Sequence, residues 1–181
     1  MKRLLLWLLA GVMLGLAIHL IVILTLPGAA TRDLWSRLAL LDAVETFKVL
    51  DDIPPGAPNP LALDPELVYG ICQLDLQDGP GIVNGALPLA YWSVAVFNRQ
   101  GHVIYATTNR SGSGETIDMG IFNPVQTRLL AEQRFEIADG LLLVESPGND
   151  VIVVLRLAPP HRAMRERYAD ALGALECATI R

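Results

Sequence analysis

Residues 91–108 read YWSVAVFNRQGHVIYATT, and this stretch decides the fold that the sequence predicts. β-Branched and aromatic residues dominate its two halves, residues 91–98 and residues 102–108, as is typical of β-strands. Between them, residues 99–101 supply a short polar turn that ends in glycine. We therefore predict an antiparallel β-hairpin here, the clearest one in the chain.

A second pair of apolar stretches lies near the C-terminus. Residues 141–145 and residues 151–157 flank the segment SPGND at 146–150, and turn-forming residues between two apolar runs predict another hairpin. Two prolines at 159–160 then stop the last strand, and a closing helix is predicted from about His161. Its buried stripe is predicted to consist of Met164, Tyr168, Ala171 and Leu175.

Further elements precede and separate the two predicted hairpins. A period of two begins at about residue 66, residues 77–80 form a turn, and residues 81–87 form a short strand. A short helix follows at 124–133. One face of the first strand is formed by Val68, Cys72, Leu74 and Leu76. Seven or so short strands with two peripheral helices predict a mainly β fold, an antiparallel jelly-roll-like β-sandwich with a C-terminal helix.

The chain opens with an uncharged apolar run. Residues 4–26 hold 19 apolar residues among 23, and a helix of that length spans a hydrocarbon core of about 30 Å. Lys2 and Arg3 precede the run, so the positive-inside rule leaves the N-terminus in the cytoplasm. We therefore expect a single-pass signal anchor in the inner (cytoplasmic) membrane, with the body in the periplasm. A cleaved signal peptide is the alternative, with small residues at 28–30, but such peptides have apolar regions of only about 7–15 residues.

Gly11, Gly15 and His19 are spaced four residues apart in this run and therefore lie along one face of a helix. Two glycines at this spacing allow a second helix to approach closely, and a histidine can form a hydrogen bond across the contact. The stripe is either a packing face for a partner helix or a chance spacing in a plain anchor, since glycine is frequent in membrane helices.

The membrane run is followed by two different segments. Thr31 predicts an N-cap, and apolar residues at helical spacing predict a juxtamembrane helix over residues 32–50. This helix either docks on the domain or lies on the bilayer, and the scarcity of Lys and Arg on its exposed face favours docking. Four prolines within residues 51–60 predict a stiff extended spacer. The predicted units are an anchor at 1–30, the helix and spacer at 31–63, and an extracytoplasmic sandwich at 64–181.

The charge balance excludes one class of partner. The net charge is −5, and without Lys2 and Arg3 the chain holds 12 basic and 19 acidic residues, a balance of −7. An acidic body without a basic stripe lacks the electrostatic features of a nucleic-acid-binding protein. We therefore expect no nucleic-acid partner.

The chain has two cysteines, Cys72 on the apolar face of the first predicted strand and Cys177 in the predicted terminal helix. In an exported domain a disulfide between them closes a loop of about 105 residues, worth roughly 4–5 kcal/mol on the chain-entropy model. Against a bridge, Cys177 falls off the buried stripe of its predicted helix. We favour the bridge, and two separate buried thiols are the alternative.

Residues with catalytic chemistry are sparse, and we predict no catalytic, metal or cofactor site. The three histidines lie far apart in sequence, and none stands at zinc-ligand spacing from a cysteine. Asn109 and Arg110 begin a Gly/Ser-rich loop, and with His102 they are the remaining candidates for gripping an anionic or sugar ligand. A solvated loop tip is the competing interpretation.

Residues 71–105, ICQLDLQDGPGIVNGALPLAYWSVAVFNRQGHVIY, follow one membrane helix and a Pro-rich spacer. In this layout the chain resembles bacterial membrane proteins grouped with the domain-of-unknown-function family 1254, over roughly residues 30–160. The matching residues are Cys72, Leu74, Asp75, Leu76, Gly79, Pro80, Pro88, Tyr91, Trp92, Ser93 and Gly101. The resemblance implies a β-sandwich. Larger relatives pair it with a companion sandwich domain that this chain lacks, which implies a partner protein carrying that companion. The family has no established reaction.

Two functions are therefore expected. The first is a membrane-anchored extracytoplasmic interaction or assembly module, with the lipid bilayer and another membrane or periplasmic protein as its partners. The alternative is a small-ligand-binding or hydrolytic envelope domain. A deep concave pocket lined by His102, Arg110 and an acid favours the second function, whereas a filled core and a flat apolar surface patch favour the first.

Overall fold

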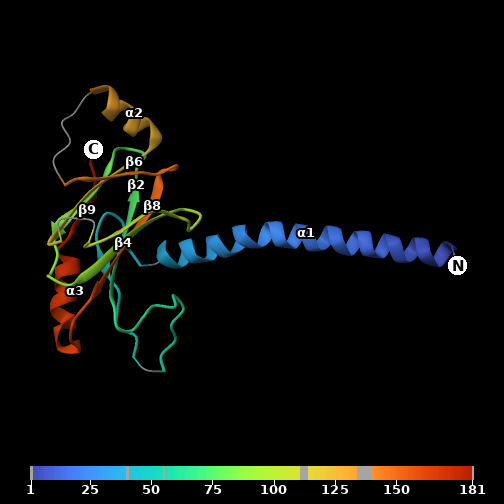
Figure 1. Ribbon diagram of the computed structural model, residues 1–181, viewed down its shortest axis with the longest axis horizontal. Coiled ribbons are helices and arrows are strands. Elements are labelled where there is room, and N and C mark those ends of the chain that lie inside the picture. Colours follow the sequence, from blue (N-terminus) through green and yellow to red (C-terminus); the bar gives the residue numbers. More distant parts are fainter. Residues whose placement is uncertain (1, 40, 55, 111–113, 134–139, 181) are drawn as a thin grey trace.

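The structure is a computed structural model that describes residues 2–39, 41–54, 56–110, 114–133 and 140–180. Helix α1 (Lys2–Ala39) projects from a body of two β-sheets, with the N-terminus at its far end (Figure 1). Within the part of the chain that the structure describes, one helical segment, Lys2–Leu26, is long and apolar enough to cross a membrane. The fold is mainly β, with an apolar N-terminal helix, as the sequence predicts.

The larger sheet has five strands in the order β1-β2-β8-β4-β5, and all neighbouring pairs are antiparallel. Val153 on the central strand lies between Cys72 and Val96 of its two neighbours. Residues 151–153 are all buried, so both faces of this strand are covered and its continuous apolar run is explained. The strands are β1 (Lys48–Val49), β2 (Val68–Asp75), β8 (Asp150–Ala158), β4 (Tyr91–Asn98) and β5 (Val103–Thr108).

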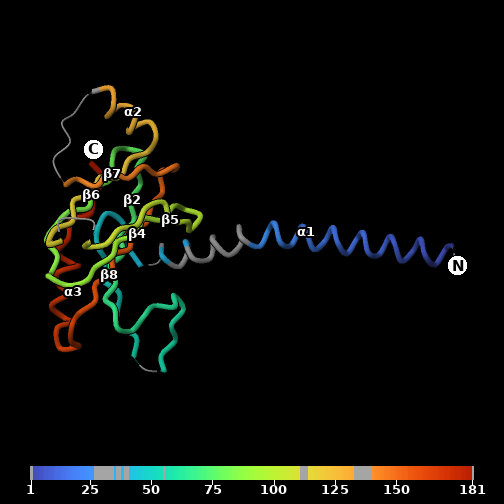
Figure 2. The backbone as a smooth tube through the Cα atoms, viewed as in Figure 1, coloured from blue at the N-terminus to red at the C-terminus, as the bar shows by residue number. Residues whose placement is uncertain are grey.

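The smaller sheet has four strands in the order β7-β6-β3-β9. They are β7 (Leu142–Glu145), β6 (Thr116–Phe122), β3 (Gly81–Ala86) and β9 (Glu176–Thr179). Strand β3 is antiparallel to β6 and β9, whereas β6 and β7 run parallel to each other. In Figure 2, β6 and β7 lie side by side. Among the strands that the structure describes, all neighbouring pairs are therefore antiparallel except β6 and β7.

A large hydrophobic core fills the space between the sheets. Trp92 from the larger sheet and Val83 and Ile121 from the smaller sheet are fully buried in it. Helix α3 (Arg165–Gly173), which follows the 3-10 turn η1 (Arg162–Met164), contributes Tyr168 and Leu172 to the same core. Apolar side chains of both sheets thus cover each other, which is the main source of stability in a two-layer fold.

The first predicted hairpin is confirmed, but the second is wrong. Strands β4 and β5 pair directly, with Ala95 opposite Ala106. Strands β7 and β8 both exist, yet they belong to different sheets. The turn between them is held by Ser146, whose side chain is fully buried and whose N–H donates to the Phe122 carbonyl at 2.8 Å. This bond ties the turn to β6, so the chain crosses between sheets instead of folding back.

Two elements of the smaller sheet differ from the prediction. Strand β6 has no predicted counterpart, although Ile117, Met119 and Ile121 alternate inward along it. The terminal helix ends at Gly173, so Cys177 lies in β9 and not in a helix as predicted. Leu175, which the prediction placed on the helix, is buried after the helix has ended. Helix α2 (Pro124–Gln133) agrees with its predicted bounds, and Asn123 caps it by accepting the Gln126 N–H at 2.9 Å.

The predicted juxtamembrane helix is continuous with the apolar N-terminal segment and ends earlier than predicted. Helix α1 runs to Ala39, whereas the prediction extended helix to Leu50. Asp42 and Glu45 have positive φ angles of 49° and 50°, which a helix does not accommodate. Residues 42–45 form hydrogen bonds with β2 instead of continuing the helix. The Gln73 N–H donates to the Ala43 carbonyl at 2.7 Å. Strand β1 then joins the larger sheet ahead of the predicted boundary at residue 64.

Candidate interaction site at the end of the anchor helix

The C-terminal end of α1 packs against the outer face of the larger sheet. Leu38 is 8% exposed and belongs to a small apolar cluster with Ala43, Ile71 and Ile152. Trp35 lies beside this cluster, and the Arg99 guanidinium stands 5.8 Å from the centre of its ring, a cation–π distance. The anchor helix is therefore joined to the sandwich by packing, ahead of the segment predicted to separate them.

A hollow of about 190 Å³ lies at this junction, and we call it the anchor hollow. Side chains of α1, of residues 61–63 and of three strands of the larger sheet line it. Its apolar wall is formed by Trp35, Leu38, Leu61, Leu63, Ile71, Phe97, Ile152 and Val154. Tyr69, Asn98, Arg99, Gly101 and Arg156 complete the lining. Within the described part of the chain, the lining therefore contains two cations and no acidic residue.

The two arginines of the anchor hollow differ in their partners. The Arg99 Nη1 forms an ion pair with Asp150 Oδ2 at 2.9 Å, with side chains 63% and 38% exposed. The Nε of Arg156 is buried and has no hydrogen-bond partner among the described residues. Because the buried Nε cannot be reached from the hollow, the Nη atoms of Arg156, which no described residue pairs, are the donors at this site that are suited to receive an anion.

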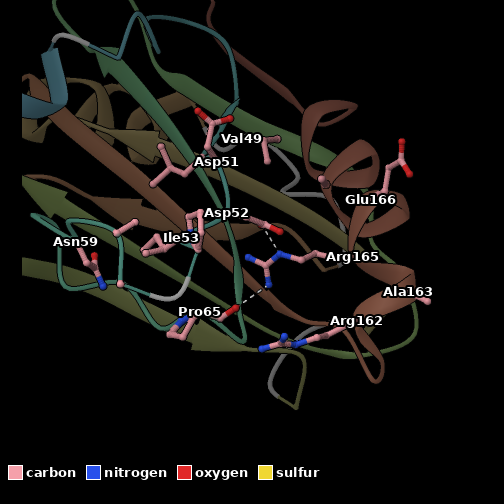
Figure 3. Close-up of a pocket in the computed structure, with 15 residues that line it drawn as sticks. Val49, Asp51, Asp52, Ile53, Asn59, Pro65, Arg162, Ala163, Arg165 and Glu166 are labelled. Carbon is pink, nitrogen blue, oxygen red and sulfur yellow. Dashed lines mark hydrogen bonds and ion pairs between the residues drawn. The ribbon is translucent and has the colours of Figure 1, made fainter.

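A larger hollow of about 1110 Å³ lies between residues 49–59 and the C-terminal helical region, and we call it the spacer hollow (Figure 3). Arg165 is its central side chain. Its Nη1 and Nη2 donate to the carbonyls of Pro65 and Leu67 at 3.0 and 2.8 Å, and its Nε is paired with Asp52. Because the side chain of Arg165 is 17% exposed and its donors are shared among these groups, it fastens the Pro-rich segment to α3.

The neighbouring charges of the spacer hollow are also paired. Arg162 Nη2 lies 2.9 Å from Glu66 Oε1, and this hydrogen bond raises the pKa of Arg162. Both side chains are well exposed, at 77% and 66%, so the pair adds little stability. In Figure 3, Glu166 points away from Arg165. The spacer hollow is thus built from groups that hold chain segments together. The Pro-rich segment forms a wall of the domain, in contrast to the predicted spacer.

The three predicted ligand-loop residues do not come together. His102 is exposed at the turn before β5, where its N–H donates to Asn98 Oδ1 at 2.9 Å. Asn109 and Arg110 follow the opposite end of β5, about 20 Å away along a strand of that length. Asn109 Nδ2 donates to the Ala90 carbonyl at 3.2 Å, so its amide holds the loop. None of the three lines either hollow.

Cys72 and Cys177 are joined in a disulfide with their Cα atoms 6.6 Å apart. Cys72 lies on β2 of the larger sheet and Cys177 on β9 of the smaller one, so the bond crosses the core. Over the described residues, no group of three or more His, Cys, Asp or Glu side chains is placed to hold a metal ion.

The stripe formed by Gly11, Gly15 and His19 lies exposed on α1. A Cβ placed on either glycine meets no heavy atom within 4 Å. The backbone is therefore open to close approach along this face, as a packed pair of membrane helices requires.

No family model matches the chain, and no curated protein matches it. Among solved structures, it is similar to the VPA0106 protein from Vibrio parahaemolyticus, with a TM-score of 0.53 and 13% identity. That match covers 76% of this chain and 30% of the other. An uncharacterised protein from Burkholderia cenocepacia has a TM-score of 0.47 at 12% identity, covering 77% of this chain and 36% of its own. This chain therefore spans about a third of the length of these proteins, and the likeness to the first shows a shared fold.

Proposed function

We propose that the protein is a single-pass module of the inner (cytoplasmic) membrane whose sandwich lies in the periplasm and assembles with another membrane or periplasmic protein. One observation carries this proposal. Leu38 and Trp35, at the end of the helix that contains the apolar run, pack on the larger sheet. The anchor therefore sets the position of the domain, which suits a protein that presents a surface at a fixed place on a membrane.

The charge and the cysteines support the proposed orientation. Lys2 and Arg3 stand before the apolar run, and positive residues of this kind remain in the cytoplasm. The disulfide between Cys72 and Cys177 suits an oxidising compartment, since such bonds are rare in the cytosol. Both features favour a periplasmic body.

The nature of the partner follows from two further features. The open face at Gly11 and Gly15 suits contact with a second membrane helix. This protein covers 30% of the Vibrio protein of similar fold, which therefore carries much additional chain. The resemblance to family 1254 adds that larger relatives carry a companion sandwich domain. We infer that a separate protein supplies that companion.

Site-specific photo-crosslinking in intact cells tests the proposal. A photoreactive residue at Val22 lies about 20° from the glycine stripe, whereas one at Met13 lies on the opposite side of the helix. We expect a discrete crosslinked species from Val22 that mass spectrometry identifies as a second membrane protein or a second copy, and much less from Met13. Equal yields from both positions, or no discrete product from either, would refute assembly through this face.

A further inference from the structure

The anchor hollow has the size and lining of a site for a small apolar group. Its volume of about 190 Å³ exceeds the roughly 150 Å³ of an apolar cavity that accommodates benzene, so a chain of about six to eight carbons fits. Trp35, Phe97 and Val154 supply apolar contact from three different elements. Such a lining with a few polar groups at one place is typical of small-molecule sites.

The charge of the lining selects an anion. Arg99 and Arg156 line the hollow, and among the residues whose side chains the structure describes no acidic residue does. Arg99 is occupied by Asp150 and by the ring of Trp35. Arg156 has no hydrogen-bond or ion-pair partner among the described residues. Its Nε is buried against the protein, so a carboxylate in the hollow reaches the Nη atoms, with which it forms charge-assisted hydrogen bonds. The complementary ligand thus has one negative head and one short apolar body.

The position of the hollow indicates the source of such a ligand. Trp35 lies nine residues beyond Leu26, the end of the apolar segment, which is about 14 Å along a helix. The outer surface of the bilayer is therefore the nearest reservoir of amphiphilic molecules. A single alkyl chain suits the volume, whereas a two-chain phospholipid exceeds it.

We propose that the anchor hollow binds a single-chain aliphatic carboxylate, with its head at Arg156 and its alkyl chain against Trp35, Phe97 and Val154. This site goes beyond the proposed assembly function. It uses the outer face of the larger sheet, and the membrane stripe takes no part in it.

Tryptophan quenching in the full chain tests the site. The protein is placed in phosphatidylcholine nanodiscs and carries Trp7→Phe, which leaves Trp35 at the hollow and Trp92 buried in the core. The probe is 8-bromooctanoate, whose bromine quenches an indole in contact with it. We expect saturable quenching by this probe, and binding about tenfold or more weaker for 8-bromooctanol, which lacks the charge.

Three variants separate specific binding from partition into the bilayer. Arg156→Gln should weaken binding about tenfold or more, and Val154→Phe should abolish it by filling the hollow while Arg156 remains. Arg110→Gln, an exposed residue outside the hollow, should bind as the parent does. Circular dichroism confirms that each variant is folded. Unchanged binding in folded Arg156→Gln, equal affinity for the alcohol, or quenching without saturation overturns the proposal. The assay contains no partner protein, so its failure is separate from a failure of the crosslinking test.

Discussion

Cys72 and Cys177 are 105 residues apart in sequence, yet a disulfide joins them across the two sheets. Replacing both by serine should lower the free energy of unfolding by about 2–5 kcal/mol, because the bond restricts a long loop of the unfolded chain. Urea denaturation of the full chain in detergent measures the change.

The same pair gives a chemical prediction. Alkylation of the exported protein under denaturing conditions should label neither cysteine unless a reductant is added first. Labelling of both without reductant would show two separate thiols and contradict the bridge.

Arg165→Met should destabilise the domain by about 2–3 kcal/mol, because it leaves the carbonyls of Pro65 and Leu67 without their donor. Arg165→Lys should recover only part of this loss, since one ammonium does not reproduce the planar fork. Thermal unfolding measures both. Arg162→Met is the matched control, and its exposed pair with Glu66 is worth about 0–1 kcal/mol. Equal effects of the two methionine variants would contradict the role assigned to Arg165.

The proposed orientation of the chain predicts the behaviour of a fusion protein. A reporter that is active only outside the cytoplasmic membrane, attached after Arg181, should be active. Moving the positive charge by Lys2→Glu and Arg3→Glu together with basic residues after Leu26 should reduce that activity. An expressed but inactive reporter on the parent chain would refute the periplasmic position.

Bulk on the glycine stripe should weaken the association of α1 with another helix. Gly15→Ile fills the open space beside the backbone and pushes a neighbouring helix outward, at the loss of close van der Waals contact. Co-purification from detergent should therefore fall, whereas Leu14→Ile on a different face should leave it unchanged. His19→Leu should cause a smaller loss, since a hydrogen bond in a membrane is worth about 0.6–2 kcal/mol. Identical behaviour of all variants would leave α1 as a plain anchor.

Local patterns were sufficient for much of the fold. The alternation at Cys72 and Leu74, the turn at 99–101 and the proline at the start of α2 each act within a few residues. The boundary of the terminal helix depends on more distant partners, because Leu175 and Cys177 are buried in the core that both sheets share and not on a helix stripe. Contacts between residues so far apart in sequence produce no pattern that can be recognised within a few neighbouring residues.

Local sequence patterns also do not predict the sheet to which β7 belongs or the presence of the anchor hollow. Both depend on residues that are distant in sequence. A polar turn at 146–150 indicates that the chain reverses, but the parallel pairing of β7 with β6, next to the bond from Ser146 to Phe122, places β7 in the smaller sheet. The hollow unites Trp35, Phe97 and Arg156, which are distant in sequence and belong to different elements. One feature of the sequence does indicate this site, namely the arginine inside the apolar stretch 151–157, since a charge in a buried strand needs a partner.

Helix α1 is a single helix from Lys2 to Ala39, and its last turns pack on the larger sheet. It therefore couples the apolar segment rigidly to the sandwich. Rotation of the apolar segment about its own axis therefore rotates the sandwich with it. The 13 residues after Leu26 place the end of α1 about 20 Å beyond the apolar run. A second helix bound to the glycine stripe therefore also sets the orientation of the sandwich about the axis of α1.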